Sequence, residues 1–170
     1  MMKVVDRLLT IIEVPIRFML WLALVAGFLM MMHVTVDVTG RTLFNRPFSG
    51  TTEIVSAYYM VAAALLPWAW LARNNDHIMV ELFTQTAPKR FNEWLDILVK
   101  IVTIAYVSLF SWQTCLRAIE QTRAGEVWEA AGRFIPVWPS RWILPIAGGL
   151  MVLYLILRVV SDAVRAARRV

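Results

Sequence analysis

The sequence predicts an all-α integral membrane protein with four membrane-spanning helices, an N-terminal amphipathic interfacial helix and both termini in the cytoplasm. Of its 170 residues 59% are hydrophobic and only 17% are charged, against about 25% charged residues in ordinary soluble domains. The mean hydropathy is +0.63. A soluble core of this size cannot bury so much apolar surface, so part of that surface must face lipid. We expect one membrane domain over residues 1–170.

The pattern of residues 1–17 predicts an amphipathic helix. Polar residues recur every three or four positions and fall within an arc of about 120°. These residues are Lys3, Asp6, Arg7, Thr10, Glu13 and Arg17. Apolar residues cover the rest, which suits a helix on the membrane surface, and Pro15 can bend it into the first span. The alternative is a plain cytoplasmic extension of the first span.

Four apolar runs predict the spans, because about 20 apolar residues cross the hydrocarbon core. The expected spans cover residues 18–37, 52–72, 94–118 and 140–160. The runs lack the period-2 alternation of barrel strands, and helices satisfy their backbone polar groups internally in lipid. Pro67 and Pro145 lie near predicted helix ends, where proline is tolerated.

The longest segment between spans is residues 117–141. Its first part is expected to continue the third helix to Ala124, with Gly125 ending the helix. The next part, from Glu126 to Gly132, is expected to form a short surface helix before Pro136.

The distribution of basic residues predicts cytoplasmic termini, since Lys and Arg favour that side. Ten of them lie on the side of the termini, and six lie on the other side: Arg41, Arg46, Arg117, Arg123, Arg133 and Arg141. A basic cytoplasmic face also accounts for the net charge of +5 without a nucleic-acid partner. The eight Trp residues fall near the span ends, as in aromatic belts.

The sequence predicts neither catalysis nor a resident cofactor or metal. Cys115 is the single cysteine. His33 and His77 are expected at opposite membrane surfaces, so they cannot bind one haem or metal ion between them. No nucleophile elbow, phosphate loop or dinucleotide-binding motif occurs in the chain.

The few charges near the spans favour structural roles. Lys100 can pair with Asp96 on one helix face or extend to the inner interface. Glu53 begins the second helix, where a carboxylate suits the helix dipole. Small residues let helices approach closely in lipid, within this chain or against another subunit. They are Ala23, Gly27, Ala57, Ala64, Ala147, Gly148 and Gly149.

Three segments carry a family pattern. The first segment runs from Arg41 to Gly50 between the first two spans, contains Arg, Asn, Pro and Gly, and is followed by Glu53. The second runs from Arg73 to His77 and precedes an alternating apolar stretch. Ile135-Pro-Val-Trp138 leads into the fourth span. Together they resemble the small four-helix membrane subunit of tripartite ATP-independent periplasmic (TRAP) transporters, the DctQ-like family. The motif residues, which the resemblance assigns structural roles, are Asn45, Pro47, Gly50, Glu53, His77, Pro136, Trp138 and Pro145.

The resemblance implies a multi-pass protein of a bacterial inner membrane, within a sodium-coupled uptake system for organic acids. Its partners would be a large TRAP membrane subunit that holds the transport sites, a periplasmic substrate-binding protein and membrane lipids. The chain would scaffold the large subunit and help to dock the binding protein. Two alternatives stay open: a self-sufficient small multidrug-type transporter, and a membrane anchor of a respiratory enzyme.

The outer surface is predicted to meet the binding protein through exposed charges, which are individually weak and act chiefly on the encounter rate. The candidate docking residues are Arg123, Arg133, Glu126, Glu129, Arg41 and Arg46. Arg123 and Arg133 are favoured because they lie farther from the bilayer. Arg41 and Arg46 are expected in a tight turn, which favours a structural role. For each residue the alternative is a lipid headgroup contact or a helix cap.

Overall fold

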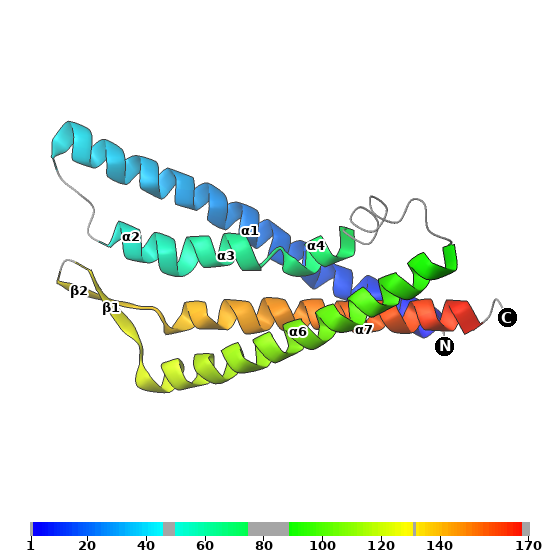
Figure 1. Cartoon of the computed structure of the whole chain (residues 1–170). Coiled ribbons are helices and arrows are strands. Elements are labelled where there is room, and N and C mark those ends of the chain that lie inside the picture. The colour runs from blue at the N-terminus through cyan, green and yellow to red at the C-terminus, as the bar shows by residue number, and fades with distance from the viewer. Residues whose placement is uncertain (1, 46–49, 75–88, 131, 168–170) are drawn as a thin grey trace.

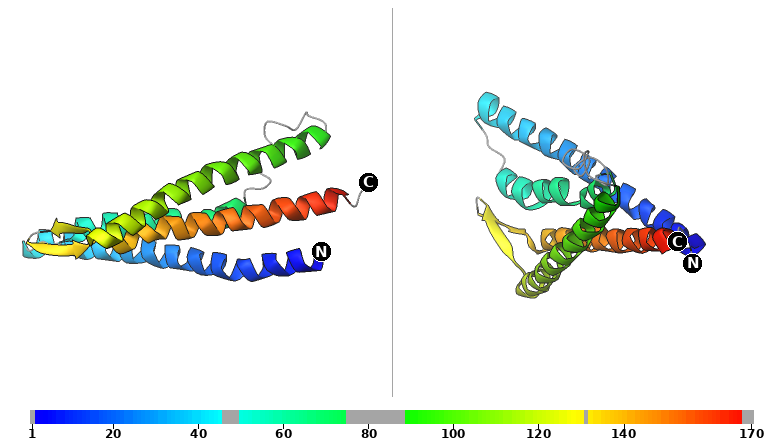
Figure 2. Two further views of the ribbon diagram at one scale, coloured as in Figure 1. Left: turned by 90° about the horizontal axis from the view of Figure 1, so that it is seen from below. Right: turned by 45° about the vertical axis from the view of Figure 1, so that its right-hand side comes forward.

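The computed structural model confirms the four predicted spans. Four helices are long and apolar enough to cross a membrane: Arg7–Phe44, Thr51–Asn74, Ile97–Ala124 and Trp138–Asp162. The structure describes residues 2–45, 50–74, 89–130 and 132–167. The start of the first helix and the end of the last lie at one end of the bundle, and a β-hairpin lies at the other (Figure 1, Figure 2).

The first helix, α1 (Met2–Phe44), joins the predicted N-terminal helix to the first span, runs through Pro15 without interruption and continues seven residues beyond the predicted end at residue 37. The expected bend therefore does not separate an N-terminal helix from the first span. Ile12 and Ile16 of the amphipathic segment are buried against other helices of the chain. This packing favours the alternative in which the segment extends the first span.

The second span is made of several pieces. It contains α2 (Thr51–Ile54), a π-helical segment η1 (Val55–Tyr59), α3 (Met60–Leu65) and α4 (Trp68–Asn74). Pro67 divides the predicted span, because proline has no N–H to continue the hydrogen-bond ladder. The Leu71 N–H donates to the Pro67 carbonyl at 2.8 Å, and the helix resumes there.

The third and fourth predicted spans each lie mostly within one long helix. Helix α6 (Lys89–Ala124) ends at Gly125, which adopts a left-handed φ of +64°. The 3-10 segment η2 (Trp138–Trp142) leads into α7 (Ile143–Ala167). Pro145 lies in the first turn of α7, where its missing N–H costs no hydrogen bond.

The expected surface helix from Glu126 to Gly132 is wrong, because the segment forms an antiparallel hairpin. Strand β1 (Val127–Ala130) pairs with β2 (Arg133–Pro136), with Trp128 opposite Ile135. Both strands are rich in β-branched and aromatic residues. Gly132 supplies a φ of +79° at the turn, which L-residues rarely adopt.

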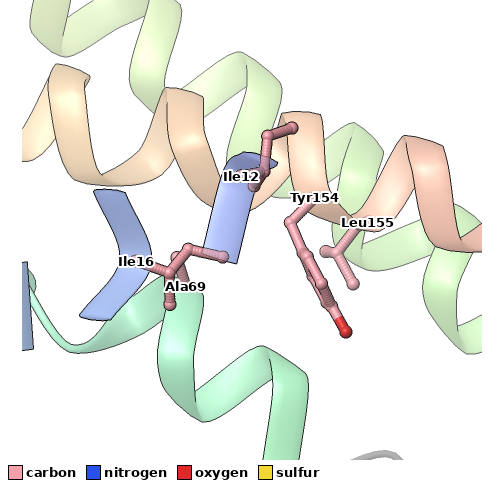
Figure 3. Close-up of a cluster of buried hydrophobic side chains, with 5 residues drawn as sticks. All are labelled: Ile12, Ile16, Ala69, Tyr154 and Leu155. Atoms are coloured by element: carbon pink, nitrogen blue, oxygen red, sulfur yellow. The ribbon is translucent and has the colours of Figure 1, made fainter. Parts of the chain in front are cut away.

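A cluster of buried side chains joins three of the helices (Figure 3). Ile12 and Ile16 of α1 meet Ala69 of α4 and Tyr154 and Leu155 of α7. The cluster joins three of the four spans, so α7 is flanked by α1 and α4 at this level. The N-terminal part of α1 is thereby part of the bundle.

Helices α6 and α7 pack closely where small residues meet. A Cβ added to Gly148 would lie 2.2 Å from the Ser111 hydroxyl oxygen, so no larger residue fits without movement. The same two helices are joined by an ion pair between Lys100 and Asp162 at 3.2 Å. The side chain of Asp96, the predicted partner of Lys100, lies outside the described side chains.

Candidate docking surface at the hairpin end

The hairpin is held at its base by contacts between residues at and just after the end of α6 and residues at and just before the segment η2. The Arg141 guanidinium donates two hydrogen bonds to the Glu126 carboxylate, at 3.0 and 2.8 Å. The Val137 N–H donates to the Glu126 carbonyl at 2.9 Å, and the Trp142 indole N–H donates to the Thr122 hydroxyl at 3.0 Å. The bidentate pair is the strongest type among these contacts.

The electrostatics of Glu126 follow from this pairing. Its hydrogen bond with Arg141 lowers the pKa of the carboxyl below the usual value, and partial desolvation opposes the shift without reversing it. Glu126 is therefore engaged within the chain. This engagement favours a structural role over docking for this candidate.

The inner face of the hairpin packs on the start of the second span. A Cβ at Gly50 would meet the Ile135 side chain at 2.8 Å and the Ala130 side chain at 3.6 Å, so glycine allows the two segments to touch. The Tyr58 hydroxyl donates to the Pro136 carbonyl at 2.5 Å. Pro136 and Gly50, both predicted structural residues, thus lie where the hairpin is fastened.

The opposite face of the hairpin points away from the bundle. In the observed register Glu129 lies directly across from Phe134, and directly opposed residues share one face. Phe134 is 70% exposed and Glu129 is exposed as well. Arg133 is also exposed, but it lies across from Ala130 and so belongs to the other face of the hairpin. The outward face combines a large apolar side chain with a carboxylate, the composition of a small interaction surface.

Arg123 lies in the last turn of α6, next to the base of the hairpin, and is exposed. Within the part of the chain that the structure describes, neither Arg123 nor Arg133 forms an ion pair. Both side chains are exposed, and their role in docking stays a prediction.

Arg41 does not lie in a tight turn as expected; it is in the last turn of α1. Its guanidinium pairs with the buried Asp37 carboxylate at 2.8 Å, one helical turn earlier. Asn45 follows the helix with a positive φ of 51°. The predicted residues Arg46 and Pro47 lie outside the described residues, so the turn itself stays a prediction.

Of the other motif residues, some lie in the segments that the structure describes and others lie outside them. Glu53 lies in the first turn of α2, as predicted, and Trp138 begins the 3-10 segment before α7. His77 lies outside the described residues. His33 packs edge-on against the Tyr59 ring, with centroids 5.9 Å apart. Among the described residues no group of three or more His, Cys, Asp or Glu could hold a metal ion.

Two fastening residues, Arg141 and Tyr58, were not predicted. Their partners lie 15 and 78 positions away, beyond the reach of helical spacing. The available signal was the hairpin itself: β-formers on both sides of Gly132. Recognising that turn would have placed Glu126 near Arg141.

One protein-family model matches residues 30–165, which include all but the N-terminal part of α1 and the very end of the chain. Its description is "Tripartite ATP-independent periplasmic transporters, DctQ component". No curated protein matches the chain at a significant level.

Proposed function

The chain belongs to the DctQ family and is a small membrane subunit of a TRAP transporter; from this premise we propose that it scaffolds the large membrane subunit through α1 and docks the binding protein through its hairpin end. The match favours this interpretation over the two alternatives, a multidrug-type transporter and a respiratory anchor. The family and the four apolar helices also make it a multi-pass inner-membrane protein.

The exposed apolar surface of α1 carries the scaffolding proposal. Toward its C-terminal end α1 diverges from α7 (Figure 1), and it contacts the rest of the chain mainly along one stripe. The exposed side chains on its other faces include Phe18, Trp21, Leu22, Val25, Phe28, Leu29 and Met32. A scaffold helix needs such a continuous surface, since association in lipid depends on packing over many side chains.

Transport chemistry is assigned to the other components. Asp37 pairs with Arg41 and Lys100 pairs with Asp162, so these charges have structural partners. We assign the sodium and organic-acid sites to the large subunit and the binding protein. This chain then needs no ion pathway of its own.

The proposed orientation places both termini in the cytoplasm and the hairpin in the periplasm. The basic-residue distribution supports it, and the bundle has both chain ends on the side opposite the hairpin (Figure 2). In this orientation Arg123, Arg133 and Glu129 face the compartment of the binding protein. A reporter fused to either terminus should stay protected from periplasmic protease.

The scaffolding proposal is tested with two tryptophans of similar exposure. Trp21 on α1 is 67% exposed and Trp112 on α6 is 70% exposed. Trp21→Ala combined with Phe28→Ala should reduce co-purification with the large subunit, whereas Trp112→Ala should not. Equal co-purification of both variants would contradict the assignment to α1.

The docking proposal is tested by charge reversal. Arg123→Glu with Arg133→Glu should lower uptake at limiting binding protein, and excess binding protein should restore most of it. The Arg123→Lys and Arg133→Lys control keeps the charge and should keep uptake. Unchanged uptake of the reversed variant at every binding-protein concentration would show that this surface does not dock it.

A further inference from the structure

A groove of about 320 Å³ lies between the end of α1 and the start of the second span. Its lining includes Val34, Asp37, Val38, Arg41, Thr52 and Met60. The function proposed above does not use it. Its volume is at the lower limit of ordinary ligand pockets.

The two charged residues of the groove are arranged asymmetrically. The Asp37 side chain is 6% exposed, whereas the Arg41 side chain with which it pairs is 53% exposed. The carboxylate therefore lies within the protein and the guanidinium lies at the opening. A guanidinium has five N–H donors in a fork that suits phosphate, and one carboxylate partner does not use all of them.

Most of the remaining wall is apolar, and the groove opens sideways. Val34, Val38 and Met60 are 39%, 55% and 55% exposed, so the groove is continuous with the outer surface of the bundle. From Val34 to Arg41 the helix rises by about 10 Å, and one leaflet of the hydrocarbon core is about 15 Å deep. The groove thus has a cationic end at headgroup level and an apolar wall along the upper acyl chain.

We propose that this groove binds a phospholipid, with the phosphodiester against Arg41 and one acyl chain along Val38, Val34 and Met60. A free phosphate would contact only the Arg41 end of the groove, whereas a phospholipid contacts both the cationic end and the apolar wall. Thr52, which is exposed at the opening, adds a hydroxyl that can donate to a phosphate oxygen. The inference needs only that the chain lies in a membrane, so it can fail while the TRAP assignment stands.

Filling the groove tests the proposal with a matched control on the same helix. Val38→Trp places an indole in the groove, whereas Val36→Trp adds the same group at a 49% exposed position that does not line it. The full chain, alone and with the large subunit, is purified in mild detergent, and bound phospholipid is measured by native mass spectrometry. Val38→Trp should lose about tenfold of the retained lipid, a loss of roughly 1.4 kcal/mol in binding, and Val36→Trp should lose none.

Variants at Arg41 test the headgroup contact. Arg41→Lys keeps the charge and should retain the lipid, whereas Arg41→Gln should lose it. A lysophospholipid should displace the bound lipid and inorganic phosphate should not. Equal retention by Val38→Trp and Val36→Trp, or displacement by inorganic phosphate, would overturn the proposal. A third outcome would also overturn it: the unmodified chain binds no lipid, and the Val38→Trp variant no longer binds the large subunit. The groove would then be occupied by a side chain of the large subunit.

Discussion

Helices α1 and α7 are similar in sequence character and different in packing. Their most apolar windows have mean hydropathies of 2.0 and 2.3, yet 6% of the first window is buried against 22% of the second. Helix α7 contacts α1, α4 and α6, whereas α1 meets its neighbours along one stripe. Hydropathy therefore identifies both as spans without showing which one is central.

The difference between the two helices depends on small residues. Ala147 and Gly148 are buried in α7, and a Cβ at Gly148 would collide with the Ser111 side chain of α6. In α1, a Cβ at Gly27 would have nothing within 4 Å. Close approach of two helix backbones stabilises helix pairs in lipid. The backbones approach closely at Gly148 but not at Gly27.

The largest effect is expected from enlarging these two glycines. Gly148→Leu should lower the free energy of unfolding in detergent by about 3 kcal/mol, because the added atoms must displace Ser111 and Val107. Gly27→Leu should leave it nearly unchanged, since the site is open. Reversible unfolding followed by Trp fluorescence measures both. If the two variants lose equal stability, the contrast between α1 and α7 is incorrect.

A smaller effect is expected from truncating one apolar side chain on each helix. Leu155→Ala in the buried cluster should cost about 2 kcal/mol, at the low end for core leucines because lipid also solvates apolar groups. Val25→Ala on the 49% exposed surface of α1 should change stability by less than about 0.5 kcal/mol. The same unfolding assay applies. A comparable loss at Val25 would mean that α1 packs more extensively within the chain than its exposure indicates.

Ion pairs extend the comparison to electrostatics. Lys100 and Asp162 join α6 to α7 with side chains 9% and 31% exposed. Glu13 and Arg17 lie one turn apart on α1 at 3.7 Å, with side chains 32% and 65% exposed, and Glu13 also pairs with Arg73 of α4 at 3.0 Å. Double-mutant cycles should give a coupling energy of about 1 kcal/mol for the first pair and about 0.3 kcal/mol for the second. Reversal of that order would show that burial does not control these energies.

The smallest effect is expected at acid pH, where Glu126 ties the hairpin to the start of α7. Because its pKa is lower in the folded state, its contribution to stability is complete above the usual glutamate pKa of about 4.3 and is lost as the pH falls through the lower folded value. Trp128 fluorescence should report loosening of the hairpin in that range. Glu126→Gln should remove this pH dependence, and the control Glu129→Gln should retain it.

The helical part of the fold could be predicted because its signals are local. Runs of apolar residues located all four spans, and Gly125 correctly marked the end of α6. The hairpin was missed because its strands are short and follow a long helix, so the loop residues gave no clear period. The division of the second span at Pro67 follows from the missing N–H of proline, but the prediction placed this proline near a helix end, where it is tolerated.

The candidate surface was predicted only in part. Exposure of Arg123 and Arg133 followed from their place in a long polar loop. The pairing of Glu126 with Arg141 could not be predicted, since it forms only after the hairpin brings the two ends together. Likewise, the pair between Lys100 and Asp162 forms because α6 and α7 pack together, so spacing along one helix could not predict it.

The length of α1 couples this subunit to bilayer thickness. Its exposed apolar side chains extend from Leu8 to Phe44, about 54 Å of helix, whereas the hydrocarbon core is about 30 Å thick. Even at a tilt of about 40°, the upper end of the observed range, this stretch spans about 41 Å, the full bilayer with its headgroups. A thinner membrane would increase that tilt, and the angle between α1 and α7 would then change with lipid composition.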